Sequence, residues 1–190
     1  MRALSPAQQA AVRRYVRPED RCRALIGKIL VKSLLNAFGL DGNLVRKIRF
    51  TEYGRPYLDL PLDFNLSHSG GLVICAGSLD CRVGIDVEAF RNRDYRAFKT
   101  FFTAREWRQV EGAEDSTATF YGIWVRKESV IKADGRGLSY PLNEMDVTKE
   151  VVIVQNFTWY LTALDHWLGY AVSLATSHLR PHVDIQEQIL

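Results

Sequence analysis

The sequence predicts an α+β fold made of two similar halves, because the same succession of elements occurs twice within 190 residues. In each half a helical segment leads to a turn containing glycine and arginine, and an apolar strand closes the half. The closing strands read Gly-Leu-Val-Ile-Cys-Ala-Gly-Ser at 71–78 and Gly-Tyr-Ala-Val-Ser-Leu-Ala-Thr at 169–176. We therefore predict an N-terminal half over 1–81 and a C-terminal half over 82–190, with a tail from about residue 177.

The first half begins with a predicted helix that Asp20 caps, since apolar residues recur at three and four positions from Leu25 to Leu35. Gly39 is its expected stop. A strand over 47–53, a turn at 54–56 and an extended segment over 63–67 follow. Two further strands are expected over 72–79 and 82–88.

The second half begins with a predicted helix over 120–133, which ends at a glycine-rich turn over 135–137. Strands are expected over 150–154, 158–165 and 169–176.

The composition is that of a soluble globular protein, with 47% hydrophobic and 25% charged residues. No apolar run is long enough to cross a bilayer, and no N-terminal stretch has the pattern of a secretory signal, so we expect a cytoplasmic protein. The net charge is only +3, but residues 1–60 carry twelve Lys and Arg against five acids. This asymmetry suits an anionic ligand or an acidic protein partner, and a solvated basic helix face is the alternative.

Two carboxylates end the apolar strand that reads Val-Gly-Ile-Asp-Val-Glu at 83–88. Asp86 and Glu88 are two positions apart, so strand alternation places both on one face. Carboxylates this close repel each other unless a cation lies between them or one is protonated. The pair suits Mg²⁺, which binds one or two carboxylates together with phosphates, although a solvated strand end is the other interpretation.

A second charged group lies on the predicted helix over 120–133. Glu128 and Lys132 are four positions apart and share a helix face, and Lys127 precedes them. A carboxylate flanked by lysines fits a metal and phosphate site, and a surface ion pair is the alternative.

The segment Ser67-His68-Ser69-Gly70-Gly71 combines hydroxyls, an imidazole and turn N–H groups, which together suit a phosphate. A serine hydrolase is disfavoured because Ser67 and His68 are adjacent on a strand and face opposite ways. The chain also has no Gly-x-Ser-x-Gly motif. Arg55 lies in a predicted turn, where it either reaches a phosphate or is simply solvated.

The order and spacing of these motifs resemble the 4′-phosphopantetheinyl transferases of the surfactin type. The matching segments are Gly54-Arg55-Pro56, Phe64-Asn65-Leu66-Ser67-His68-Ser69-Gly70, Val83-Gly84-Ile85-Asp86-Val87-Glu88, Phe101-Phe102-Thr103-x-x-Glu106, Trp124-x-x-Lys127-Glu128-Ser129-x-x-Lys132 and Gly135-x-Gly137-Leu138. The resemblance implies a single chain built as a pseudo-dimer. Its two α/β halves would be related by a pseudo-two-fold axis, each a small, mostly antiparallel sheet packed on a long helix.

The reaction that the resemblance implies moves the 4′-phosphopantetheine arm of coenzyme A to a serine of an apo acyl or peptidyl carrier protein, releasing adenosine 3′,5′-bisphosphate. Mg²⁺, with Mn²⁺ as the alternative, would be the metal, and coenzyme A the co-substrate. We expect a monomer with no nucleic-acid or membrane partner. The carrier's pathway stays open among fatty-acid, polyketide, siderophore and nonribosomal-peptide synthesis.

The resemblance also implies roles for individual residues. The metal ligands would be Asp86, Glu88 and Glu128, and the catalytic residues Glu128, Asp86 and Lys132. Glu128 would act as base, directly or through a metal-bound water. Contacts to coenzyme A would come from Arg17, Arg23, Gly54, Arg55, Ser67, His68, Lys127 and Lys132. Glu106 matches a recurrent acid without an assigned role. Two rival functions are a non-catalytic binding module and a different Mg²⁺ enzyme acting on nucleotides, which the missing GxxxxGK[ST] motif disfavours.

Overall fold

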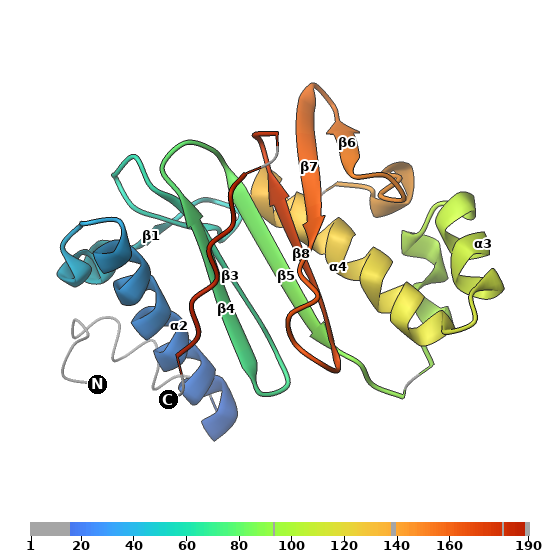
Figure 1. The fold of residues 1–190 in the computed structure, drawn as a ribbon, viewed down its shortest axis with the longest axis horizontal. Helices are drawn as coiled ribbons and strands as arrows, with labels where there is room; N and C mark the ends of the chain where they lie inside the picture. The colour runs from blue at the N-terminus through green and yellow to red at the C-terminus, as the bar shows by residue number, and fades with distance from the viewer. Residues whose placement is uncertain (1–15, 93, 138–139, 180, 189–190) are drawn as a thin grey trace.

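The computed structural model describes residues 16–92, 94–137, 140–179 and 181–188. Two long helices, α2 (Pro18–Ala37) and α4 (Ser116–Asp134), pack against small antiparallel sheets (Figure 1). This α+β arrangement confirms the predicted fold class. Neither helix has the length and hydropathy of a membrane span within the described residues.

The strands form three separate hydrogen-bonded sheets among the described residues. β1 pairs with β2, β3 with β4, and the remaining strands follow the order β5-β8-β7-β6. Their bounds are β1 (Arg49–Phe50), β2 (Pro56–Tyr57), β3 (Asp63–Ser69), β4 (Leu72–Ser78), β5 (Val83–Ala89), β6 (Val151–Val154), β7 (Phe157–Ala163) and β8 (Tyr170–Thr176). In Figure 1, β5 lies between the β3–β4 hairpin and β8, so it joins the two parts of the molecule.

Helix α2 begins earlier than the sequence predicted. Pro18 occupies its first turn, and Arg17 is the N-cap residue, whose own side chain makes no capping hydrogen bond. Asp20 therefore lies within the first turn, where its negative charge interacts favourably with the positive N-terminal end of the helix dipole. Buried Val31 and Leu35 pack against Phe64 of β3, which forms the core of the first half.

The prediction of a strand over 47–53 is mostly wrong. Residues Gly42–Lys47 form the short 3₁₀ helix η1, and only Arg49–Phe50 pair as a strand. The turn predicted at 54–56 lies earlier: the N–H of Gly54 donates to Thr51 O at 3.0 Å, and Pro56 already belongs to β2. Gly54 has a φ of 80°, which suits glycine.

A helix that the sequence analysis did not identify follows β5. After the 3₁₀ helix η2 (Arg96–Phe101), α3 (Ala104–Gly112) begins with a capping box between Thr103 and Glu106. Helix α4 then runs from Ser116, and a further 3₁₀ helix, η4 (Leu142–Glu144), follows it. These helices enclose an aromatic core with β6, β7 and β8.

The segment predicted as a tail has no helix or strand in its described part, but it packs on the molecule. Figure 1 shows it running back across the first half toward α2. Val183 packs against the apolar cluster that contains Ile74 and Val87. Gln188 accepts a hydrogen bond from Ser33 of α2 at 3.3 Å.

Candidate active site

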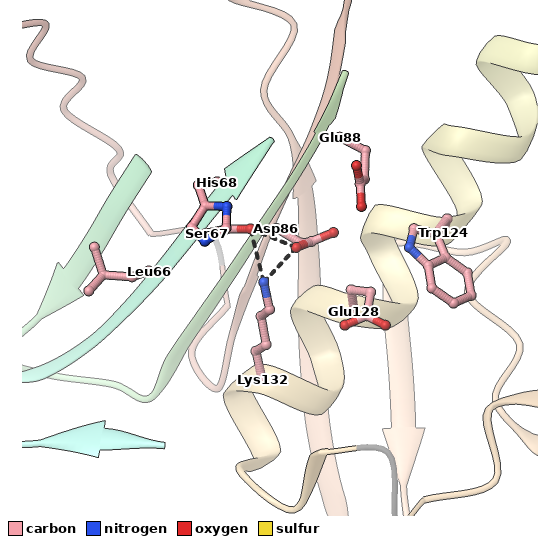
Figure 2. A pocket seen from close by; sticks show the side chains of 8 residues that line it. All are labelled: Leu66, Ser67, His68, Asp86, Glu88, Trp124, Glu128 and Lys132. Carbon is pink, nitrogen blue, oxygen red and sulfur yellow. Dashed lines mark hydrogen bonds and ion pairs between the residues drawn. The ribbon is translucent and has the colours of Figure 1, made fainter. Parts of the chain in front are cut away.

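A cavity of about 320 Å³ lies between β3, β5 and α4. Its lining is polar and carries three carboxylates and one lysine (Figure 2). The residues that line it are Leu66, Ser67, His68, Asp86, Glu88, Trp124, Glu128 and Lys132.

Strand β5 presents alternate residues to α4, and this explains why both of its carboxylates reach the cavity. Gly84, two positions before Asp86, lies against the helix backbone: a Cβ there would be 2.1 Å from the carbonyl oxygen of Ser129. Glycine thus allows strand and helix to approach closely. Figure 2 shows the carboxylates of Asp86 and Glu88 directed toward the face of α4 that carries Glu128.

Helix α4 contributes residues at a spacing of four. Trp124, Glu128 and Lys132 therefore lie on one face, one above the other, and all line the cavity. The neighbouring Ser129 packs beneath them and donates a hydrogen bond to Ser173 of β8 at 3.2 Å. The helix is thus held on the sheet with its polar face toward β5.

Strands β3 and β5 are joined through side chains. The N–H groups of β5 that face away from β8 donate to polar side chains of β3 in a regular series. The contacts are Val83 N to Asp63 Oδ2 (2.7 Å), Ile85 N to Asn65 Oδ1 (3.1 Å), Val87 N to Ser67 Oγ (3.3 Å) and Ala89 N to Ser69 Oγ (3.1 Å). We call Asp63, Asn65, Ser67 and Ser69 the β3 ladder. It satisfies an edge of the sheet that would otherwise leave backbone donors unpaired.

Asp86 is 4% exposed and makes strong contacts through one oxygen only. Its Oδ1 accepts hydrogen bonds from Ser67 Oγ at 2.8 Å and from Lys132 Nζ at 2.6 Å, and Lys132 also donates to Ser67. Its Oδ2 is buried and has no hydrogen-bond partner among the residues that the structure describes. A buried carboxylate oxygen without a donor is costly, so this atom suits a cation or a donor supplied by a ligand.

Glu88 has a similar contact two residues further along. Ser69 Oγ donates to Glu88 Oε2 at 2.7 Å, just as Ser67 donates to Asp86. Glu88 is half-buried and lines the cavity.

The surroundings of Glu128 change the protonation of its carboxylate. Burial raises its pKa from the ordinary 4.5 to about 7, and the negative charges of Asp86 and Glu88 act in the same direction while Lys132 opposes them. A carboxyl that titrates near neutral pH can both accept and release a proton under physiological conditions.

The chemistry of the lining residues fits a divalent cation held jointly with a phosphate ligand. Among the described residues no group of three or more His, Cys, Asp or Glu side chains is already arranged around a metal position. However, Asp86 Oδ2 is unpartnered, and the carboxylates of Asp86 and Glu88 raise the pKa of Glu128. Mg²⁺ commonly binds one or two carboxylates together with substrate phosphates and water, so it does not require a complete protein cage.

Arg55 is not among the residues that line this cavity, and its expected contact to coenzyme A stays a prediction. It is 8% exposed, and its guanidinium donates to Val83 O (3.0 Å), to Ala133 O (3.1 Å) and to the carbonyl of Lys132. It also pairs with Asp63 at 2.5 Å. The forked geometry of arginine allows one side chain to join the turn, the β3 ladder and the end of α4.

Lys127 also lies outside the cavity, because its side chain leaves another face of α4 and contacts α3 and η4. Its side chain is fully buried and pairs with Glu106 at 2.8 Å, and its Nζ donates to the carbonyl of Leu142 at 2.8 Å. Burial lowers the pKa of Lys127, while Glu106 opposes that shift. Glu106 in turn accepts from Thr103 N and Val147 N, so the structure gives this acid a role in the core.

The remaining expected contacts to coenzyme A stay predictions. Arg17 is exposed at the start of α2, and Arg23 donates to the carbonyl of Gly70 at 3.1 Å and pairs with Asp20. Gly54 lies in the β1–β2 turn. Ser67, His68 and Lys132 do line the cavity.

The sequence analysis did not single out Trp124 or Ser69 as site residues. Trp124 lies one helical turn before Glu128, so spacing alone was a usable signal. Ser69 is two strand positions after Ser67 and shares its face.

Family comparisons agree with this geometry. Residues 82–178 match the model of the 4′-phosphopantetheinyl transferase superfamily, and residues 1–80 match the N-terminal model of 4′-phosphopantetheinyl transferase. The chain belongs to this superfamily. It is a 4′-phosphopantetheinyl transferase.

Several curated relatives in this superfamily are similar over most of the chain. The 4′-phosphopantetheinyl transferase Sfp of Bacillus subtilis (strain 168) is 39% identical over 155 residues, covering 77% of this chain and 67% of the relative. The 4′-phosphopantetheinyl transferase gsp of Aneurinibacillus migulanus is 34% identical over 160 residues, covering 80% and 67%. The chain thus spans about two thirds of the length of these relatives. The holo-[acyl-carrier-protein] synthase of Thermotoga maritima is similar in structure at a TM-score of 0.40 and 16% identity, over 50% of this chain and 62% of that one.

Proposed function

We propose that this phosphopantetheinyl transferase uses coenzyme A and a divalent cation, Mg²⁺ in the first instance, to modify a serine of an apo acyl or peptidyl carrier protein. The observation that carries the proposal is the convergence of Asp86, Glu88, Glu128 and Lys132 on one cavity between β3, β5 and α4. Carboxylates for a cation and an ammonium group for a phosphate are the charges that this reaction needs.

The reaction is attack by the serine hydroxyl oxygen on the phosphorus that bears the pantetheine arm. A new P–O bond forms to the carrier, the pyrophosphate P–O bond breaks, and adenosine 3′,5′-bisphosphate leaves. The serine proton must be removed, and negative charge on the leaving phosphate must be neutralised.

Glu128 is the proposed base, acting directly or through a metal-bound water. Burial raises its pKa to about 7 in the metal-free site, and a bound cation would lower that pKa. Lys132 is the proposed phosphate contact. Its Nζ already lies at the cavity wall between Ser67 and Asp86, and a lysine ammonium can donate three hydrogen bonds.

The residues proposed to hold the cation are Asp86, Glu88 and Glu128. A bound Mg²⁺ or Mn²⁺ would supply charge neutralisation at the pyrophosphate. Asp86 would contribute Oδ2, the buried oxygen to which no described residue donates a hydrogen bond. Ser67 and Lys132 would keep Oδ1 fixed and so orient the other oxygen toward the cavity.

His68 and Ser67 are proposed to contact coenzyme A at the β3 side of the same cavity, since both line it and His68 is exposed. We further propose that the protein acts as a cytoplasmic monomer whose two halves form a pseudo-dimer. The support is that both α4 and β3, from the two predicted halves, contribute to one cavity.

The test is to incubate the protein with coenzyme A, Mg²⁺ and several apo carrier proteins, and to weigh the carriers by intact mass spectrometry. We expect a mass increase equal to the phosphopantetheine arm, which disappears when EDTA replaces Mg²⁺. Glu128→Gln should abolish the increase. Glu114→Gln, which makes the same chemical change at an exposed site outside the cavity, should not.

Absence of any mass increase across carriers of both the fatty-acid and the peptide-synthetase type would refute the proposed reaction. Full activity in EDTA would refute the proposed requirement for a divalent cation and would leave the proposed transfer reaction standing.

A further inference from the structure

Ser69 is a buried hydroxyl whose hydrogen bonds have one consistent direction. It is 6% exposed, and its Oγ accepts from the N–H of Ala89 at 3.1 Å. Its own proton is therefore free to be donated, and Glu88 Oε2 lies 2.7 Å away. A short hydrogen bond to a carboxylate is of the charge-assisted kind, which is roughly twice as strong as a neutral one.

The same arrangement occurs two residues earlier on both strands. Ser67 accepts from Val87 N at 3.3 Å and donates to Asp86 Oδ1 at 2.8 Å. Because the contacts between β3 and β5 keep the same residue offset along both strands, each serine of the β3 ladder donates a hydrogen bond to one carboxylate of β5. The repetition shows that the Ser69–Glu88 contact follows from the strand register.

The two carboxylates differ in what else holds them. Asp86 is also bonded to Lys132 at 2.6 Å, whereas Ser69 is the hydrogen-bond donor that the described part of the chain provides for Glu88. Glu88 is also longer by one methylene and only half-buried, so it has more rotamers to lose on binding a ligand. Its orientation therefore depends on Ser69 more than that of Asp86 depends on Ser67.

The turn that carries Ser69 is itself fixed. Arg23 of α2 donates to the carbonyl of Gly70 at 3.1 Å, and the N–H of Gly71 donates to the Tyr170 hydroxyl at 3.3 Å. Contacts from α2 and β8 thus set the end of the β3–β4 hairpin, and the hydroxyl of Ser69 is presented to Glu88 from a rigid position.

We propose that Ser69 is a positioning residue for the divalent cation: it holds Glu88 Oε2 and directs Oε1 into the cavity as a ligand. This inference rests on the proposed function, since it requires a cation at the site. Residues that orient metal ligands typically change metal affinity by about 10- to 100-fold when they are removed.

The experiment measures Mn²⁺ affinity directly, from the EPR signal of free Mn²⁺ titrated with the full-length protein in the presence of coenzyme A. Ser69→Ala should weaken Mn²⁺ binding by about tenfold, and Glu88→Ala by at least as much. In the double variant Ser69→Ala/Glu88→Ala the affinity should equal that of Glu88→Ala, because Ser69 acts only through Glu88. Ser69→Thr, which keeps the donor, should restore binding to within about twofold of wild type.

Asn65→Ala is the matched control. Asn65 belongs to the β3 ladder and accepts from Ile85 N, but it donates to neither Asp86 nor Glu88 in the structure. Its substitution should lower the urea midpoint of unfolding and leave Mn²⁺ affinity unchanged. If Ser69→Ala does not fold, Ser69→Cys replaces it, since a thiol of similar size is a weaker donor and should give a smaller loss of affinity.

Unchanged Mn²⁺ affinity in Ser69→Ala would overturn the inference, as would an additive loss in the double variant or an equal loss in Asn65→Ala. In these cases wild-type protein still binds Mn²⁺ and modifies its carrier, so the proposed function stands. Failure of wild-type protein to bind Mn²⁺ with coenzyme A present would overturn this inference and the proposed cation, whereas the proposed transfer reaction is tested separately by the mass increase of the carrier.

Discussion

Gly84 of β5 faces the backbone of α4 at a distance that leaves no room for a side chain. A Cβ at this position would lie 2.1 Å from Ser129 O and 2.3 Å from Ala133 N. The backbone atoms of a helix cannot move independently of one another. Gly84→Ala must therefore move the whole helix away from the strand by roughly 1 Å before the distance from the added Cβ to the helix backbone becomes acceptable. Overpacking of this kind lowers the free energy of unfolding by about 1–3 kcal/mol, and we expect a loss near the upper end of this range because both clashing atoms belong to the backbone.

The same displacement acts on the candidate site. Lys132 Nζ is 2.6 Å from Asp86 Oδ1, and an added separation of about 1 Å would lengthen this contact to roughly 3.6 Å, beyond hydrogen-bond range. A misplacement of about 1 Å can lower a catalytic rate by about 100-fold. The assays are the urea midpoint followed by tryptophan fluorescence, and the initial rate of carrier modification by intact mass spectrometry at a temperature where the variant is folded.

Gly122→Ala provides the control, because it makes the same substitution within α4 where a Cβ would meet nothing within 4 Å. Alanine in a helix interior should stabilise this variant by up to about 1 kcal/mol and leave the rate unchanged. A Gly84→Ala protein with wild-type stability and a wild-type rate would refute the claim that close packing of β5 on α4 sets the site.

Three other outcomes are expected. Lys127→Met and Glu106→Gln should each cost about 3–5 kcal/mol of unfolding free energy, and the double variant less than their sum, when measured by urea denaturation. Because burial raises the pKa of Glu128 from 4.5 to about 7, its contribution to stability is present below pH 4.5 and is lost as pH rises through 7. In EDTA the urea midpoint of wild type should therefore fall between about pH 5 and pH 8, and that of Glu128→Gln should fall less. Arg55→Lys should lower the free energy of unfolding by about 1–3 kcal/mol, since lysine cannot satisfy all the carbonyl and carboxylate partners of the guanidinium. The KM for coenzyme A should stay near that of wild type. A large rise in KM would instead indicate that Arg55 contacts coenzyme A.

The strands of the candidate site were predictable because their signal is local. Alternation along 83–88 placed Asp86 and Glu88 on one face, and helical spacing placed Glu128 and Lys132 together, as the cavity confirms. Helix α3 was predictable in principle from its capping box at Thr103 and Glu106 but was not identified.

The sequence by itself determined the two long helices, most of the strands, the shared faces of the charged residues and, through motif order, the family. Only the tertiary structure decided which charges are free for chemistry. Arg55, Lys127 and Lys132 are all cations within motifs, yet the first two are bonded inside the protein and Lys132 alone of these three reaches the cavity. The pairing of the polar β3 residues with the edge of β5 was likewise not indicated by the sequence. The physical reason is that hydrogen-bond partners 20 or more residues apart are set by packing, which local periodicity does not encode.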